Sequence, residues 1–213
     1  MAISRRFGIP VILGSAVVFI FSTFNAEPAN ENTLNKTLAL DLLNQLSIQE
    51  ENREGYEREL FMDNWSDLDA DGCDTRREVL FQESLTSVIV EEDCKIISGE
   101  WISTYDGIIT KEPAEFDIDH FVPLAEAWDS GASLWNDEER KLFAEDLIDA
   151  DSLIAVSRQS NRNKGDRDPA EWLPILPETH CWYVTTWISI KHRWRLSVDQ
   201  KEFEAIRETL TLC

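Results

Sequence analysis

Residues 117–124, DIDHFVPL, and residues 160–166, SNRNKGD, are the two stretches that decide how this chain folds. The first puts a carboxylate next to a histidine on an apolar segment that reads as a strand. The second supplies amide oxygens beside cations, on a segment suited to a short helix. Together they provide a proton acceptor, oxygen donors for a metal ion and positive charge.

These residue types suit phosphodiester hydrolysis, which needs a base to activate water and a cation to neutralise charge. We expect His120 to be the base, because an imidazole can take a proton at neutral pH. Asp119 and Asn161 are the expected ligands of one Mg²⁺ or Mn²⁺ ion, since both metals prefer oxygen donors. Neighbours in a strand point to opposite faces, so His120 and Asp119 can border one site only where the strand twists or ends.

Cations gather beside the expected metal ligand. We expect Arg158, Arg162 and Lys164 to bind backbone phosphates of the substrate. Asn163 is an alternative metal ligand, but it lies about 200° around a helix from Asn161, so only one of the two can face the metal. Asp117 is a further alternative, as a ligand or an orienting group.

Four blocks of this sequence resemble the secreted branch of the HNH endonuclease superfamily, the ββα-metal nucleases. The similarity covers about residues 56–195 and is carried by WSDLDADGCDTRREVL at 65–80, GEWISTYDG at 99–107, DIDHFVPLAEAW at 117–128 and LIAVSRQSNRNKGDRDPAEWLP at 153–174.

The resemblance implies an α+β fold, in which a ββα-metal core of HNH type is surrounded by helices. It assigns the metal ligands to Asp119 and Asn161 and the general base to His120. The middle polar residue of the superfamily motif has no clear equivalent ahead of residues 153–156. Three residues could stand in for it and orient His120, namely Asp149, Asp151 and Ser152.

The first 26 residues read as an export signal, with Arg5 and Arg6 ahead of a long apolar run. We expect a secreted or periplasmic protein, and the length of the run leaves an uncleaved membrane anchor open. Residues 27–50 read as a polar N-terminal segment. Residues 51–213 read as a single nuclease domain that begins with a helix over 51–66.

Four cysteines follow the signal, an even number in a chain bound for an oxidising compartment. They permit three connectivities, of which we favour Cys73 with Cys94 and Cys181 with Cys213. A zinc site is the alternative, but no Cys-x-x-Cys pair supports it.

The net charge is −21, from 41 acidic and 20 basic residues, and such a surface repels nucleic acid at long range. Salt shortens the range of this repulsion, so that only charge near the site matters. A divalent ion in the site would offset more of it.

Residues 67–78, DLDADGCDTRRE, match the pattern of a calcium-binding loop. The expected ligands are side chains together with the Cys73 carbonyl, and they comprise Asp67, Asp69, Asp71, Cys73 and Glu78. An acidic surface turn and a direct catalytic part are the alternatives.

The sequence as a whole predicts an exported, metal-dependent endonuclease that hydrolyses DNA, with RNA as an alternative substrate. We expect it to be largely nonspecific for sequence, because so short a chain has no added DNA-binding module. No stable protein partner is implied. The alternatives are a secreted calcium-binding protein without enzymatic activity, and a catalytically dead nuclease fold that binds nucleic acid.

Overall fold

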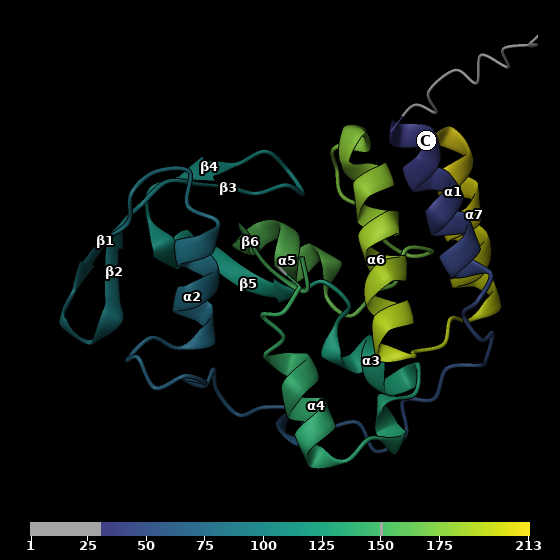
Figure 1. Cartoon of the computed structure of the whole chain (residues 1–213), viewed down its shortest axis with the longest axis horizontal. Coiled ribbons are helices and arrows are strands. Elements are labelled where there is room, and N and C mark those ends of the chain that lie inside the picture. The colour runs from purple at the N-terminus through teal and green to yellow at the C-terminus, as the bar shows by residue number, and fades with distance from the viewer. Residues whose placement is uncertain (1–30, 150) are drawn as a thin grey trace, which may run out of the picture.

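The computed structural model describes residues 31–149 and 151–213 of the chain, so the expected export signal at 1–26 lies outside it. The described residues form a mixed α/β fold with three small antiparallel sheets and two disulfides. Two of the sheets lie at one end of the molecule and a layer of long helices at the other, with the third sheet between them (Figure 1).

The central sheet pairs β5 (Phe116–His120) with β6 (Leu153–Ser157), and α5 (Arg158–Lys164) follows β6 directly. Asp119 lies opposite Ile154, and His120 lies opposite Leu153. All of β6 is buried, as its apolar sequence requires. The connection between the strands holds α3 (Leu124–Asp129), the 3₁₀ turn η4 (Ala132–Leu134) and α4 (Asp137–Ala144).

A helical layer covers one side of this unit. It consists of α1 (Glu31–Leu43), α6 (His180–Trp194), which follows the 3₁₀ turn η5 (Pro177–Thr179), and α7 (Gln200–Leu212). Ala39 and Leu43 of α1 are 1% exposed and belong to the same core as α6 and α7. Part of the segment at 27–50, which was expected to be a polar stretch, therefore contributes to the core.

A smaller core lies on the other side of the central sheet. It is built by α2 (Thr75–Gln82) and by the hairpin of β3 (Trp101–Ile102) and β4 (Ile109–Thr110). Its buried members are Val79, Leu80, Trp101, Phe116, Ile118, Leu153 and Ala155.

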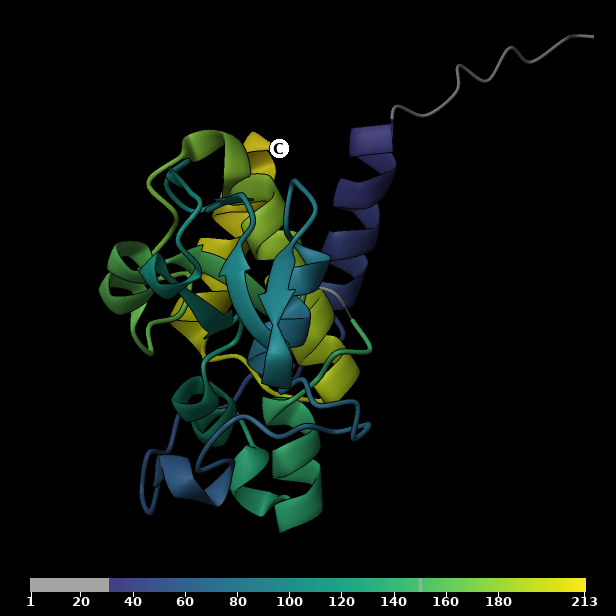
Figure 2. The same cartoon turned by 90° about the vertical axis from the view of Figure 1, so that its left-hand side faces the viewer.

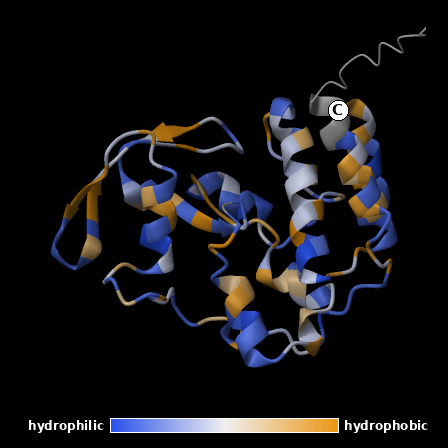
Figure 3. Cartoon of the chain, viewed as in Figure 1, coloured by the Kyte–Doolittle hydropathy of each residue, from blue (hydrophilic) through white to orange (hydrophobic). Residues whose placement is uncertain are grey.

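The outermost hairpin pairs β1 (Ile89–Glu91) with β2 (Lys95–Ser98) across the 3₁₀ turn η2 (Glu92–Cys94), and η3 (Pro113–Glu115) leads into β5. Figure 2 shows this hairpin from the front. Apolar residues recur along the strands of both outer hairpins (Figure 3). Ile89 and Ile109 are among the exposed ones.

Both expected disulfides are present. One joins Cys73 to Cys94 and so ties the start of α2 to the outer hairpin. The other joins Cys181 to Cys213 and fastens the end of α7 to the start of α6. The spacing of the cysteines predicted this connectivity correctly.

The helix expected over residues 51–66 is wrong. This segment is mostly extended and holds only the 3₁₀ turn η1 (Arg58–Leu60). Its contacts are tertiary: Arg53 pairs with Asp129 at 2.6 Å, and Trp128 Nε1 donates to the Glu54 carbonyl at 3.1 Å. The segment is a strap across the domain, in which Tyr56 and Phe61 pack on Trp128 of α3 instead of lining one face of a helix.

Candidate functional site

A cavity of about 290 Å³ opens at the end of β5. His120, Asp119 and Asn161 all line it, together with Arg58 from the strap. Strand β5 ends at His120, so the alternation of side chains no longer separates His120 from Asp119. Helix α5 packs against both strands and carries Asn161 to the same place. The three residues on which the sequence prediction depends therefore meet around one space.

The ring of His120 is fixed on two sides. Its Nε2 lies 2.8 Å from the Ala144 carbonyl oxygen, and its face stacks on Trp65 with ring centroids 5.2 Å apart. A carbonyl can only accept, so Nε2 carries the proton and Nδ1 keeps the lone pair of the neutral ring. Burial lowers the pKa of His120 to about 3 and outweighs the Ala144 bond, which raises it. The imidazole is thus neutral at working pH and able to accept a proton.

The group that orients His120 differs from all three sequence candidates. Ser152 Oγ donates instead to Asp146 at 3.0 Å, and Asp149 faces Arg193 at 3.8 Å. The orienting atom is a main-chain oxygen at the end of α4, at Ala144. No side-chain motif could have identified it, because any residue type supplies a carbonyl.

The carboxylate of Asp119 has two different oxygens. Oδ2 accepts from Tyr105 Oη at 2.7 Å and from Lys164 Nζ at 2.6 Å. Oδ1 takes no hydrogen bond from any described residue, and Asp119 lines the cavity. Burial raises the pKa of Asp119 and lowers the pKa of Lys164, while their mutual attraction opposes both shifts.

Lys164 does not have the expected phosphate-binding geometry. Its side chain is 0% exposed, and its ammonium group is bonded to Asp119 and to the His120 carbonyl at 2.9 Å. A group that is enclosed in this way cannot reach a phosphate outside. Lys164 instead acts inside the site, as the counter-ion of the expected metal ligand.

The choice between the two asparagines follows from their contacts. Asn161 lines the cavity, and its Nδ2 points to Asp117 Oδ2 at 3.5 Å, which leaves its amide oxygen without a partner among described residues. Asn163 is turned away, and its Oδ1 accepts from Trp172 Nε1 at 2.8 Å. Of the two asparagines, Asn161 is therefore the one whose amide oxygen is free within the described residues and lies at the cavity. Asp117 lies 3.6 Å from Arg158 and borders the ligand set without lining the cavity.

Arg58 is a charged residue of the cavity that the sequence did not identify. It is exposed, and its guanidinium forms no ion pair with a carboxylate in the described part of the chain. In the sequence it stands between Glu57 and Glu59, so no basic cluster marks it. Arg162 on α5 is likewise exposed, whereas Arg158 also donates to the Ala114 carbonyl.

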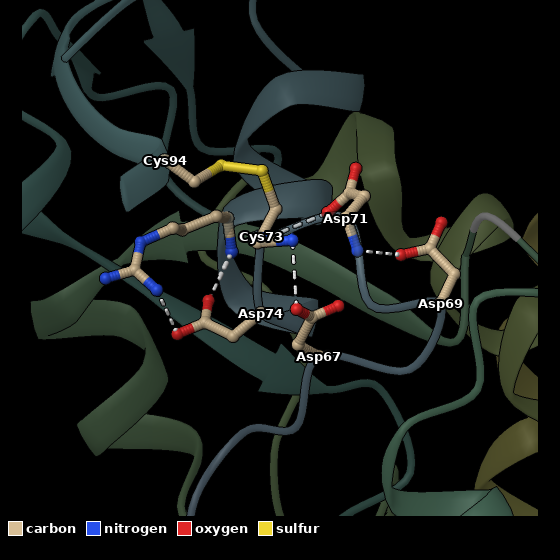
Figure 4. The surroundings of a disulfide bond; sticks show 8 residues. Asp67, Asp69, Asp71, Cys73, Asp74 and Cys94 are labelled. Atoms are coloured by element: carbon tan, nitrogen blue, oxygen red, sulfur yellow. Dashed lines mark hydrogen bonds and ion pairs between the residues drawn. A yellow bond between two sulfur atoms is a disulfide. The ribbon is translucent and has the colours of Figure 1, made fainter. Parts of the chain in front are cut away.

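The acidic loop after the strap gathers three carboxylates. Oxygens of Asp67, Asp69 and Asp71 lie within 4.8 Å of one another, and all three residues are exposed (Figure 4). The main chain turns around them, with the Cys73 amide donating to Asp71 at 2.7 Å. Glu78 on α2 is not part of this group, although burial and the three aspartates raise its pKa.

Residues 64–209 match the family model of the C-terminal domain of GmrSD restriction endonucleases. The chain belongs to this family. It is also 36% identical over 199 residues to a protein of Arthroderma benhamiae described as an uncharacterized secreted protein, covering 93% of this chain and 96% of that protein. No solved structure matches the chain.

The family match includes His120, Asp119, Asn161 and Lys164, whereas Arg58 lies before its first residue. The catalytic candidates therefore belong to a nuclease family, and the strap adds a cation from outside the matched region. Within residues 31–149 and 151–213, no helix has both the length and the apolar character needed to span a membrane.

The buried neutral state of His120 predicts an acid-sensitive fold. The unfolded chain binds a proton at His120 below the ordinary pKa of 6.5, whereas the folded chain does not until about 3. The contribution of His120 to the free energy of unfolding is therefore fully present above pH 6.5, and it is lost as the pH falls from 6.5 toward about 3. Between pH 7 and pH 5, we expect the free energy of unfolding of His120→Gln to fall by about 2 kcal/mol less than that of the wild type. Urea unfolding at the two pH values measures this difference. Equal losses in both chains would contradict the buried neutral imidazole.

Proposed function

We propose that this chain is an exported, metal-dependent endonuclease of HNH type that hydrolyses phosphodiester bonds of DNA, with RNA as an alternative substrate. The main support is the meeting of His120, Asp119 and Asn161 around one cavity at the end of a strand–strand–helix unit. Membership of a nuclease family points to the same class of reaction.

The donor set fits one Mg²⁺ or Mn²⁺ ion. Asp119 has a free Oδ1 and Asn161 a free amide oxygen, and hard divalent ions prefer such ligands. When bound, the ion would neutralise charge on the phosphate and on the leaving 3′ oxygen. His120 is not a ligand in this scheme, because its role needs the Nδ1 lone pair.

The protein's own groups move the proton. Nδ1 of His120 takes a proton from the attacking water, while the Ala144 carbonyl and the Trp65 ring keep the imidazole in place. The charged imidazole then stands in a buried setting that lowers its pKa, so it readily returns the proton to solvent. The same burial therefore keeps the ring unprotonated before the reaction, and it also weakens the ring as a base.

Binding of the nucleic-acid backbone falls to exposed arginines. Arg58 lines the cavity and Arg162 lies on the same helix as Asn161, and neither has a carboxylate partner within the described residues. Contacts to phosphates carry no sequence information, which favours nonspecific cleavage. Export is supported by the secreted relative and by the two disulfides, which persist in oxidising compartments.

The proposed base is tested by a plasmid-nicking assay with Mg²⁺, Mn²⁺ or EDTA. We expect His120→Ala to nick about 10²–10⁴-fold more slowly than the wild type, because that is the usual contribution of a general base. EDTA should abolish the activity of the wild type.

A matched control is His192→Ala, on α6, which should keep wild-type activity. Full activity in His120→Ala would remove this mechanism. No nicking by the wild type with either metal would favour the two alternatives, a nuclease fold that only binds nucleic acid and a calcium-binding protein.

Arg58 is tested by its effect on substrate binding. A contact to a phosphate that is equally strong in the ground state and the transition state changes KM and leaves kcat alone. We expect Arg58→Gln to raise KM about tenfold. We also expect the slope of log affinity against log salt concentration to fall by about the amount that one phosphate contact contributes. Arg207→Gln, a charge-matched change on α7, should alter neither quantity, and a loss confined to kcat would contradict the assigned role.

The loop at 67–78 is also a candidate calcium site, favoured by the three converging carboxylates of Asp67, Asp69 and Asp71. We expect calorimetry to find a Ca²⁺ site in the wild type that is absent in Asp69→Ala. Saturating Ca²⁺ at a hundred times its Kd should stabilise the wild type by about 2.7 kcal/mol. Asp63→Ala, an exposed acidic residue outside the loop, is the control. Unchanged Ca²⁺ binding in Asp69→Ala would make the loop an acidic surface turn.

A further inference from the structure

We propose that Lys164 is a positioning residue that cancels the charge of Asp119, so that the cavity binds its metal ion firmly only when a phosphate of the nucleic acid is present. This inference rests on the proposed function and adds an order of binding to it. It concerns a lysine that was expected on the surface and is instead fully enclosed.

The contacts of Lys164 leave little freedom to either partner. Its ammonium group lies 2.6 Å from Asp119 Oδ2, and Tyr105 Oη donates to the same oxygen at 2.7 Å. Asp119 therefore offers only Oδ1 to the cavity. The bond from Lys164 to the His120 carbonyl holds the end of β5 at the same time. One side chain of α5 thus sets the direction of the carboxylate and the position of the base.

The charges around the cavity balance. Asp119 is paired with Lys164, and His120 and Asn161 are neutral. Asp166 shares Arg53 with Asp129, at 2.6 Å in each case, which leaves one negative charge that Arg58 offsets. Among the described residues that line the cavity, the two carboxylates are therefore each paired with a cation, although the chain as a whole carries −21.

A site without net charge holds a divalent ion weakly, because Mg²⁺ gives up its water reluctantly and needs strong donors to replace it. A substrate phosphate supplies the missing negative charge and a further oxygen ligand. Metal and nucleic acid should then strengthen each other's binding by the same factor, as linkage requires. The acidic surface elsewhere on the chain cannot perform this role, because its charge is not placed at the cavity.

The test measures Mn²⁺ affinity by electron paramagnetic resonance, in the full chain carrying His120→Ala so that substrate is not cleaved. Binding is compared with and without a single-stranded DNA oligonucleotide, whose own Mn²⁺ binding is measured separately. A chain that also carries Asp119→Asn and Lys164→Met measures how much Mn²⁺ binds to other acidic groups, and this amount is the baseline. The two changes are made together because they remove both charges of the buried pair.

We expect the oligonucleotide to tighten Mn²⁺ binding above the baseline at least about tenfold. Lys164→Met should tighten Mn²⁺ binding to the free protein by about the same factor, since it leaves Asp119 uncompensated. Tyr105→Phe removes a hydrogen bond from the same oxygen without changing the charge, and it should alter the affinity less than about threefold.

Mn²⁺ binding that is equally tight without the oligonucleotide would overturn the inference and leave the proposed endonuclease standing. Equal tightening by Lys164→Met and Tyr105→Phe would also overturn it, because occupancy of Oδ2 rather than charge would then be the cause. Absence of binding above the baseline, with or without the oligonucleotide, would overturn the metal site itself. If Lys164→Met does not fold, the inference is tested by the change in Mn²⁺ affinity that the oligonucleotide causes in the chain with Lys164 intact.

Discussion

A single buried ion pair, Lys164 with Asp119, joins the helix and the strand on which the whole site depends. Removing one partner of such a pair leaves a charge buried without compensation, which is far more costly than never burying either. Asn161 lies one turn before Lys164 on α5, and His120 follows Asp119 at the end of β5. Because the ion pair joins α5 to β5, it also helps to hold the Asn161 amide close to the His120 imidazole.

The arrangement also explains how an acidic chain can have a site for an anionic polymer. Long-range repulsion acts over the whole surface, but its reach is limited by salt to about a Debye length. The two carboxylates that line the cavity in the described part of the chain, Asp119 and Asp166, each have a cationic partner, and Arg58 lines the same cavity. Local pairing, rather than overall composition, sets the potential that a bound phosphate experiences.

Much of the site was visible in the sequence, because its central residues lie on short segments with strong local patterns. The strand expected at residues 117–124 formed as β5, which ends at His120, and the short helix expected around residues 160–166 formed as α5. The disulfides followed from spacing alone. Prediction failed where tertiary contact outweighs local preference: the strap looked helical, Lys164 looked exposed, and the partner of His120 was a carbonyl. None of these three depends on a motif, since each is decided by segments remote in the chain.

The position of Arg58 on the strap has a consequence for how such a protein can change. The proposed base, the proposed metal ligands and Lys164 all lie within the region that matches the family model, whereas Arg58, which lines the cavity, lies ahead of it. The arginine that is proposed to bind substrate and the residues that are proposed to carry out the reaction thus lie in different stretches of the chain. Substitution of Arg58 can therefore alter the binding of substrate while the proposed base and the proposed metal ligands stay unchanged.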